Sequence, residues 1–415
     1  MIPLMRLPLC SLSHEGTTVT ARRRWFLLLL APLATFWISI PPGYAQSHHK
    51  PSTRLPRRID QGIVWQRDAS TGELRAGAAG DPSGESNAPP GLHPMRALTQ
   101  MVPVTCVVST ADGAAVPGLR REDFRIFEDG AEQAIAYFDA STAPASVALV
   151  IDASPSVLRD SDEMKRAADA LIGALAPLDQ AAVVDFSAHT YLQLGFTDVR
   201  EVVRRAVARV DVRSLLGDTG GSNIYQSVYL AARELFPGRT GRKAILLLTD
   251  GQDSGLGLTL DPASDAPQPG RLANRLTFDD VARLLAAQDI QVFAVSTENR
   301  PKVMTPAWLA AHQSETLISP AARKLDLPPY TLYLAELVRR AGGQLYFLRE
   351  SETMADTFRQ IAQKIRAEYT LGFYPARGAS ETSTRPGWHS LRVEAVEQPG
   401  VRVTHRAGFY VPAAP

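Results

Sequence analysis

Short apolar runs recur in the middle of the chain and predict buried strands. The four clearest runs are rich in β-branched residues and span 146–151, 181–186, 244–248 and 290–295. Uninterrupted apolar runs of this length are typical of parallel strands that are covered on both faces. Apolar and small residues at helical spacing predict helices at 160–176, 200–210, 223–235, 278–287, 332–341 and 353–367. Strands that alternate with helices indicate a doubly wound α/β domain with a mostly parallel sheet.

The segments on either side of this domain have the pattern of strands and turns. Apolar strand-like runs lie within 102–139 on the amino-terminal side, and at 369–374, 391–396 and 401–405 on the carboxy-terminal side. Two or three strands are only marginally stable alone. We therefore expect both segments to form one small β-sandwich into which the α/β domain is inserted.

The first part of the chain has the pattern of an export signal. Three arginines at 22–24 precede an apolar stretch over 25–40, and Ala45 is a small residue at a suitable cleavage point. We therefore expect an export signal over 1–45 and a location in the periplasm, in the cell envelope or outside the cell. The apolar stretch is shorter than a membrane span of about 20 residues. An uncleaved leader that serves as an amino-terminal membrane tether is the alternative.

Composition gives the remaining domain boundaries. Residues 46–98 are rich in Pro, Gly, Ser and Ala, and we interpret them as a flexible tether with some order near the apolar run Ile63-Val64-Trp65. An amino-terminal β segment at 99–140, the α/β domain at 141–368 and a carboxy-terminal β segment at 369–415 follow. Cys10 lies in the leader, which leaves Cys106 alone in a predicted strand. A buried thiol is favoured there over an intermolecular disulfide, because its neighbours in the strand are apolar.

The overall composition is that of a globular protein without a nucleic-acid footprint. The chain has 415 residues, of which 45% are apolar and 21% are charged, and its formal net charge is +1. This balance gives no electrostatic basis for binding nucleic acid or an anionic membrane. The length suits about two domains plus a leader.

Hydroxyl and carboxylate side chains gather where predicted strands end and where one helix begins. Asp152, Ser154 and Ser156 follow the first strand, Ser222 precedes the helix at 223–235, and Asp250 follows the third strand. In doubly wound sheets ligands bind outside the carboxyl ends of the strands, so we expect these side chains to converge. Two carboxylates and three hydroxyls suit a hard divalent cation and leave room for an outside ligand.

Simpler interpretations of these residues exist. The segment from Asp152 to Ser156, taken alone, is typical of a helix N-cap, because Asp and Ser side chains accept backbone N–H bonds. Thr219 competes with Ser222 for the role of the third hydroxyl. The order of all three segments, each beside a strand or helix terminus, favours the metal site.

Together these segments resemble the metal-ion-dependent adhesion site of von Willebrand factor type A domains. The matching runs are Asp152-Ala-Ser-Pro-Ser156, Gly220-Gly-Ser222 and Thr249-Asp-Gly251. The resemblance implies that Ser154, Ser156 and Ser222 are direct metal ligands, and that Asp152 and Asp250 act directly or through water. The family usually has Thr in place of Ser222, which keeps the hydroxyl, and often has Gly in place of Pro155. The implied cofactor is Mg²⁺, with Mn²⁺ or Ca²⁺ as alternatives.

A narrower resemblance covers 102–411. Short runs at 117–130, 369–375 and 406–410 resemble the acidobacterial-type von Willebrand factor A-related family, whose biochemical role is not well defined. The implied function is an exported, non-enzymatic adhesion protein whose cation captures an Asp or Glu of a protein partner. The alternative is an assembly module of a cell-envelope complex in which the metal only stabilises loops.

An enzymatic function has little basis in the sequence. Residues 218–220 match the short Asp-Thr-Gly box of aspartic proteases, but that chemistry needs a second carboxylate box, which this chain lacks. The chain has no nucleophile elbow, no zinc-protease helix motif and no phosphate-binding loop. We therefore expect no enzymatic activity and no small-molecule substrate, and a hydrolase is the least favoured alternative.

Overall fold

The computed structural model describes most of the chain from Pro56 onward, namely residues 56–68, 74–78, 101–110, 114–140, 143–210, 221–256, 275–305, 308–309, 312, 317–318, 327–347, 354–375, 387–396 and 400–411. All of these belong to one unit of the chain, His49–Pro415. The predicted export signal lies outside the described residues, and so do Cys10, Asp218 and Thr219. Within the described ranges, no helix has the length and apolar character that a membrane crossing requires.

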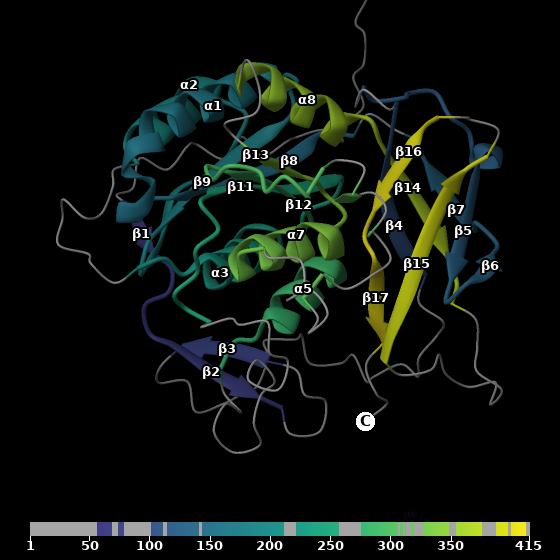
Figure 1. Ribbon diagram of the computed structural model, residues 1–415, viewed down its shortest axis with the longest axis horizontal. Coiled ribbons are helices and arrows are strands. Elements are labelled where there is room, and N and C mark those ends of the chain that lie inside the picture. Colours follow the sequence, from purple (N-terminus) through teal and green to yellow (C-terminus); the bar gives the residue numbers. More distant parts are fainter. Residues whose placement is uncertain are drawn as a thin grey trace, which may run out of the picture. The chain divides into compact units, whose positions relative to one another are not determined.

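In the described residues, seven strands form the central sheet, in the order β1-β10-β9-β8-β11-β12-β13 (Figure 1). Five of them run parallel to one another: β8 (Ala145–Asp152), β9 (Gln180–Phe186), β11 (Arg242–Thr249), β12 (Gln291–Ser296) and β13 (Leu345–Phe347). Two antiparallel strands, β10 (Thr190–Thr197) and the short β1 (Arg57–Arg58), complete one edge. The predicted doubly wound α/β domain with a mostly parallel sheet is therefore confirmed.

Helices cover both faces of this sheet (Figure 1). One layer contains α1 (Ser161–Ala174), α2 (Arg200–Ala208) and α8 (Met354–Arg366), and the other contains α3 (Ile224–Leu235), α5 (Phe278–Ala287) and α7 (Pro329–Ala341). Leu149 and Leu246 pack in the core under the first layer, whereas Val150 and Leu247 pack under the second. Successive side chains of a strand point to opposite faces, which explains why these strands carry apolar residues on both faces along most of their length.

The flanking segments form two antiparallel four-stranded sheets. The first combines β4 (Val102–Ser109) and β7 (Tyr137–Asp139) with β14 (Glu368–Phe373) and β16 (Arg402–His405). The second combines β5 (Phe124–Glu128) and β6 (Ala131–Gln133) with β15 (Gly387–Ala395) and β17 (Gly408–Val411). Each sheet thus draws strands from both ends of the chain, as expected for a shared sandwich.

One apolar core lies between these two sheets. It includes Val104, Ile126, Leu371 and Val393, which come from both flanking segments. Cys106 belongs to the same core as a fully buried free thiol, and burial raises its pKa. The prediction of a buried thiol is confirmed.

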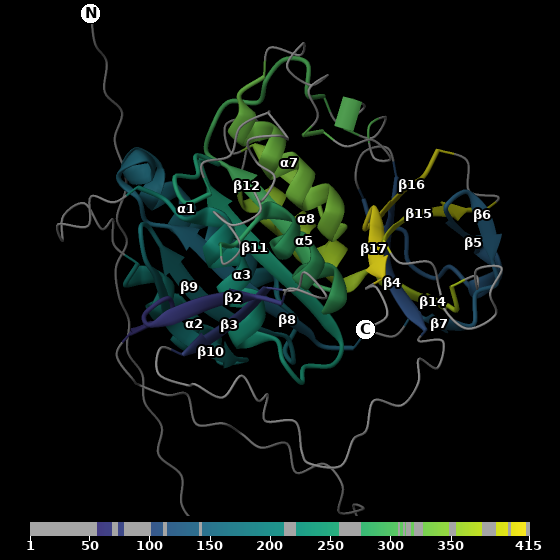
Figure 2. The same ribbon diagram turned by 90° about the horizontal axis from the view of Figure 1, so that it is seen from below.

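Part of the segment interpreted as a flexible tether is structured. Besides β1, it contains a hairpin of β2 (Ile63–Arg67) and β3 (Leu74–Ala78) (Figure 2). The Trp65 ring meets Tyr229 of α3 edge-on at a centroid distance of 5.4 Å, and Leu74 is buried in the core of the α/β domain. Arg67 also binds Asp280 of α5 through two hydrogen bonds of 2.9 and 2.6 Å. The Pro- and Gly-rich composition of the whole segment obscured these few anchoring side chains.

Candidate metal centre

The candidate centre lies where the two central strands end. β8 and β11 pair in parallel, with Ile151 opposite Leu248, and their last residues are Asp152 and Thr249. Asp250 comes directly after Thr249. Because both strands run in the same direction, these polar side chains emerge at the same edge of the sheet, which is the edge that binds ligands in folds of this class.

Asp152 is held by three donors from three separate segments. Its Oδ1 accepts the backbone N–H of Ser154 at 2.9 Å. Its Oδ2 accepts the hydroxyls of Thr249 at 2.6 Å and Ser222 at 3.2 Å. The carboxylate is 2% exposed, so these bonds fix its orientation in a site that water hardly reaches. Thr249 belongs to the Thr-Asp-Gly segment of the sequence motif, but the motif did not predict that its hydroxyl donates to Asp152.

Ser154 and Ser156 lie at the start of a short 3₁₀ helix, η2 (Pro155–Asp160). Ser154 occupies the N-cap position of η2, yet its side chain makes no capping hydrogen bond. Its hydroxyl instead lies 3.0 Å from that of Ser156. The simple N-cap interpretation therefore does not account for this serine, and both hydroxyl oxygens remain available as ligands.

The loop before α3 brings Ser222 to Asp152. Gly221 has a φ of +88°, which L-residues rarely adopt. A Cβ atom at this position would lie 2.5 Å from the Ser254 hydroxyl. Glycine thus allows the close approach in which Ser254 N donates to Ser222 O at 2.7 Å. Ser222 is 3% exposed and faces the centre, whereas its competitor Thr219 is outside the described residues.

Asp250 has one carboxylate oxygen with a partner and one without. Its Oδ1 accepts the backbone N–H of Gln252 at 2.8 Å. Its Oδ2 is buried and has no hydrogen-bond partner within the described structure. A buried, unpaired carboxylate oxygen is costly, so it marks a place where a ligand or ion belongs.

The electrostatics of the centre favour a cation. Burial, together with the negative charge of Asp250, raises the pKa of Asp152 to about 6, although hydrogen bonds from Ser154 and Thr249 act to lower it. Two carboxylates that disfavour each other's charge in a buried site gain most from a shared cation. The described residues contain no cluster of three or more His, Cys, Asp or Glu side chains suited to a metal. A metal here would therefore depend on the serine hydroxyls as well as on two carboxylates.

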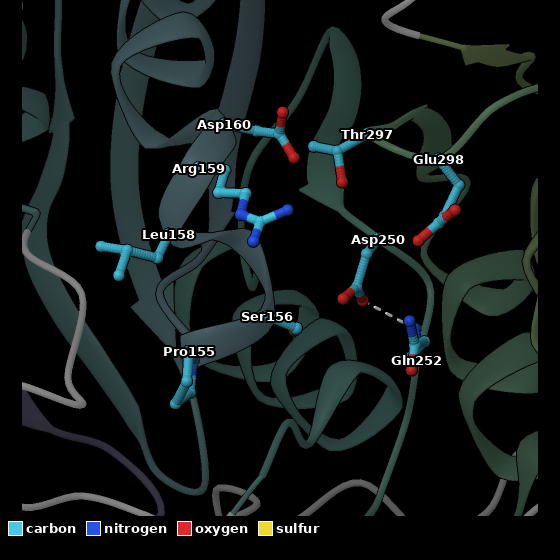
Figure 3. Close-up of a pocket in the computed structure, with 9 residues that line it drawn as sticks. All are labelled: Pro155, Ser156, Leu158, Arg159, Asp160, Asp250, Gln252, Thr297 and Glu298. Atoms are coloured by element: carbon cyan, nitrogen blue, oxygen red, sulfur yellow. Dashed lines mark hydrogen bonds between the residues drawn. The ribbon is translucent and has the colours of Figure 1, made fainter.

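A pocket of about 310 Å³ opens beside these residues (Figure 3). Ser156 and Asp250 line it together with residues that the sequence did not single out, namely Pro155, Leu158, Arg159, Asp160, Gln252, Thr297 and Glu298. Thr297 and Glu298 directly follow β12, and Thr297 N donates to Thr249 O at 3.0 Å. The sequence signal for this wall of the pocket was the pair of polar residues directly after the predicted strand at 290–295.

The structure thus brings the five predicted site residues to one edge of the sheet. Hydrogen bonds join Asp152, Ser154, Ser156 and Ser222, while Asp250 shares the pocket with Ser156 and acts on Asp152 through its charge. The donor set, two carboxylates and three hydroxyls, fits a hard cation such as Mg²⁺.

Comparison with known families identifies the α/β domain. Residues 147–252, which include all five site residues, match the von Willebrand factor type A domain family. This part of the chain is therefore a von Willebrand factor type A domain. The match does not test the narrower resemblance across 102–411, which stays a prediction. No curated protein matches the chain.

Solved structures with similar folds come from several sources. A von Willebrand factor type A protein from Catenulispora acidiphila is 15% identical, with 74% of each chain covered and a TM-score of 0.35. An aerotolerance-related membrane protein from Bacteroides fragilis is 16% identical, with 53% of this chain and 98% of that chain covered and a TM-score of 0.36. Proximal thread matrix protein 1 from the mussel byssus, with a zinc-occupied metal site, is 16% identical, with 57% and 48% covered and a TM-score of 0.37. Similarity at this level carries no argument about function.

Proposed function

We propose that this protein is a non-enzymatic binding protein that captures an acidic side chain of a protein partner through a divalent cation. Asp152, Ser154, Ser156, Ser222 and Asp250 would hold the cation, with Mg²⁺ as the first candidate and Mn²⁺ or Ca²⁺ as alternatives. When bound, the cation would supply an open coordination position for an Asp or Glu carboxylate. The von Willebrand factor type A domain is a protein-interaction domain, which is the broader class to which this proposal belongs.

The observation that carries the proposal is the unpaired, buried Oδ2 of Asp250 beside Asp152. Without a counter-charge, burial and the nearby charge of Asp250 penalise the ionised form of Asp152 and raise its pKa. A divalent cation offsets both charges and gives Asp250 Oδ2 a partner. The pocket beside Ser156 and Asp250 leaves room for a group from outside the chain.

Location is part of the same proposal. The basic and apolar leader over 1–45 would direct the protein out of the cytoplasm, to the periplasm, the cell envelope or the medium. The sandwich and the structured hairpin would then present the α/β domain to partners. Whether the leader is removed or stays as a membrane tether is decided by mass determination of the mature amino terminus.

An assembly module is the second candidate, and contacts between the sandwich and the α/β domain favour it. Arg406 is 4% exposed and donates at 2.5 Å to Ala286 O of α5, and it also donates to Pro103 O of β4. The Thr105 hydroxyl donates to Asp289 at 2.6 Å. Such a polar, buried joint holds the two parts in a fixed arrangement, as an assembly module requires.

Partner capture from an envelope fraction in Mg²⁺ and in chelator separates the two candidates. Capture should need the cation, should be lost in Ser222→Ala and should persist in Ser222→Thr, which keeps the hydroxyl. Replacing single acidic residues of the identified partner by amides should then locate the captured side chain. Binding that chelator and Ser222→Ala leave unchanged would refute metal-dependent capture and favour the assembly module.

A further inference from the structure

The pocket beside the centre contains one basic side chain. Arg159 lines it together with three acidic residues, Asp160, Asp250 and Glu298. Figure 3 shows the Arg159 guanidinium directed toward the space between Asp160, Asp250 and Ser156. A carboxylate that entered this pocket without Arg159 would meet, apart from the cation, mainly groups of its own charge.

Local geometry explains why Arg159 faces the centre. Ser156 and Arg159 both belong to η2, a 3₁₀ helix over Pro155–Asp160. In a 3₁₀ helix there are three residues per turn, so side chains three positions apart lie on the same face. The face that presents the Ser156 hydroxyl to the candidate centre therefore also presents Arg159 to the pocket.

The Arg159 guanidinium is available for an outside ligand. It is exposed, and within the described residues it has no hydrogen-bond or ion-pair partner. Its planar set of N–H donors matches the two oxygens of a carboxylate, which Lys cannot reproduce with a single ammonium group. The pocket volume of about 310 Å³ lies at the lower end of the range for ligand sites and suits one side chain better than a larger group.

We infer that Arg159 is a specificity-determining residue of the capture site and binds the second oxygen of the carboxylate whose first oxygen completes the cation's coordination. This inference rests on the proposed function. It accounts for selection of a carboxylate over an amide. If the single oxygen of an Asn or Gln side chain binds the cation, its NH₂ group faces the guanidinium of Arg159 and cannot accept a hydrogen bond. Asp160 and Glu298 on the same walls disfavour a second acidic group beside the first.

The test measures the cation and the carboxylate separately in the full chain. Mn²⁺ binding is followed alone through the relaxation of water protons. The blocked tripeptide acetyl-Gly-Asp-Gly-amide is then added, with its Asn counterpart as the comparison. Displacement of water from the bound Mn²⁺ reports the carboxylate. The variants are Arg159→Gln, Arg159→Lys and, as a matched control in the sandwich, Arg125→Gln, whose side chain is 54% exposed.

The wild type should bind the Asp peptide more tightly than the Asn peptide. Arg159→Gln should weaken the Asp peptide about tenfold, as expected for the loss of a charge-assisted hydrogen bond. The affinity of Arg159→Lys for the Asp peptide should lie between those of the wild type and Arg159→Gln. The affinity of Arg125→Gln should equal that of the wild type. Arg159→Gln should bind Mn²⁺ slightly more tightly than the wild type, by no more than about threefold. The reason is that a positive charge near the cation has been removed, and solvent screens its effect.

Each contrary result has its own meaning. Unchanged Asp-peptide affinity in Arg159→Gln overturns the role of Arg159 and leaves metal-dependent capture standing. Inorganic sulfate, titrated in place of the peptide, is a further comparison. If it binds more tightly than the Asp peptide, the inference that the ligand is a carboxylate is wrong. Equal binding of the Asp and Asn peptides by the wild type, or no saturable Mn²⁺ binding, overturns this inference together with the proposed function.

Discussion

Thr249 donates its hydroxyl hydrogen to Asp152 Oδ2 at 2.6 Å, across the ends of the neighbouring strands β11 and β8. The same hydroxyl accepts the backbone N–H of Gly251 at 3.0 Å. One fully buried side chain thus connects the carboxylate of Asp152 to the turn that carries Asp250. The spacing of the two acidic groups depends on it.

Replacing Thr249 by Val should therefore damage both stability and cation binding. Val has nearly the same shape but lacks the hydroxyl, so Gly251 N loses its acceptor and Asp152 loses a donor. We expect a loss of about 1–3 kcal/mol in the free energy of unfolding. Mg²⁺ affinity should fall several-fold because Asp152 is less well oriented, and Thr249→Ser should preserve both properties. Urea denaturation and calorimetric titration of the two variants test this, and wild-type values for Thr249→Val would contradict it.

Cation binding should stabilise the folded chain. Mg²⁺ or Mn²⁺ that binds only the folded state adds about 2.7 kcal/mol at a hundred times its dissociation constant. Asp152→Ala should abolish the rise in melting temperature, and Asp169→Ala, at an exposed position on α1, should retain it. Differential scanning calorimetry gives the answer. An equal rise in Asp152→Ala and in the wild type would place the cation elsewhere.

Glu336 of α7 should contribute stability that depends on pH. Burial raises the pKa of this carboxyl, but hydrogen bonds and charge from Arg339, with the charge of Arg340, outweigh burial and hold it at about 2. A folded-state pKa below the unfolded one stabilises the fold above the unfolded pKa, and this contribution is lost as pH falls from about 4.5 to about 2. The shift corresponds to about 3 kcal/mol.

Glu336→Gln should therefore destabilise the protein by about 3 kcal/mol near neutral pH, because the partly buried Arg339 and Arg340 lose a counter-charge. The difference from wild type should shrink as the pH is lowered through about 4. Urea denaturation at several pH values measures it. Glu132→Gln, at an exposed position on β6, is the control and should be neutral. A difference that does not change with pH would rule out the assigned ion pairs as its cause.

The hairpin of β2 and β3 should be a stable part of the fold. Trp65→Ala removes the ring that packs on Tyr229 and should cost about 2–3 kcal/mol in the free energy of unfolding. Val64 is 42% exposed on the same strand, so Val64→Ala should change stability by less than about 0.5 kcal/mol. If this segment were a flexible tether, the two variants would be equally harmless in urea denaturation.

Local patterns were sufficient for the α/β domain and for the expectation that the five candidate site residues gather at one edge of its sheet, while their role as metal ligands stays a prediction. The parallel strands carry apolar residues on both faces because helices cover both faces, and the resulting apolar runs are visible in the sequence of β8, β9, β11 and β12. Strand β10, which lies between β1 and β9, was not predicted, because its mixture of buried and partly exposed positions gives no continuous apolar run. The donor role of Thr249 and the pocket wall at Thr297 and Glu298 depend on the register between strands. A sequence does not give that register before the fold is known.

The position of Arg159 and the hairpin at 63–78 were also missed, because both depend on contacts between segments or on local structure that the sequence pattern does not show. The placement of Arg159 on the same face as Ser156 depends on the helical turn η2 ahead of α1, which the sequence pattern did not predict. The hairpin at 63–78 was hidden by the composition of its surroundings, and the short apolar run Ile63-Val64-Trp65 was the signal that indicated some order there. Side chains that act across strands or loops are therefore the part of a site that sequence reasoning misses most readily.

Calorimetric titration of the full chain with Mg²⁺ tests the central claim most directly. The wild type should bind one cation per chain, Ser222→Ala and Asp152→Ala should lose saturable binding, and Ser222→Thr should retain it because the ligand oxygen is kept. The absence of saturable binding by the wild type, or undiminished binding by Ser222→Ala, would contradict a metal centre formed by Asp152, Ser154, Ser156, Ser222 and Asp250.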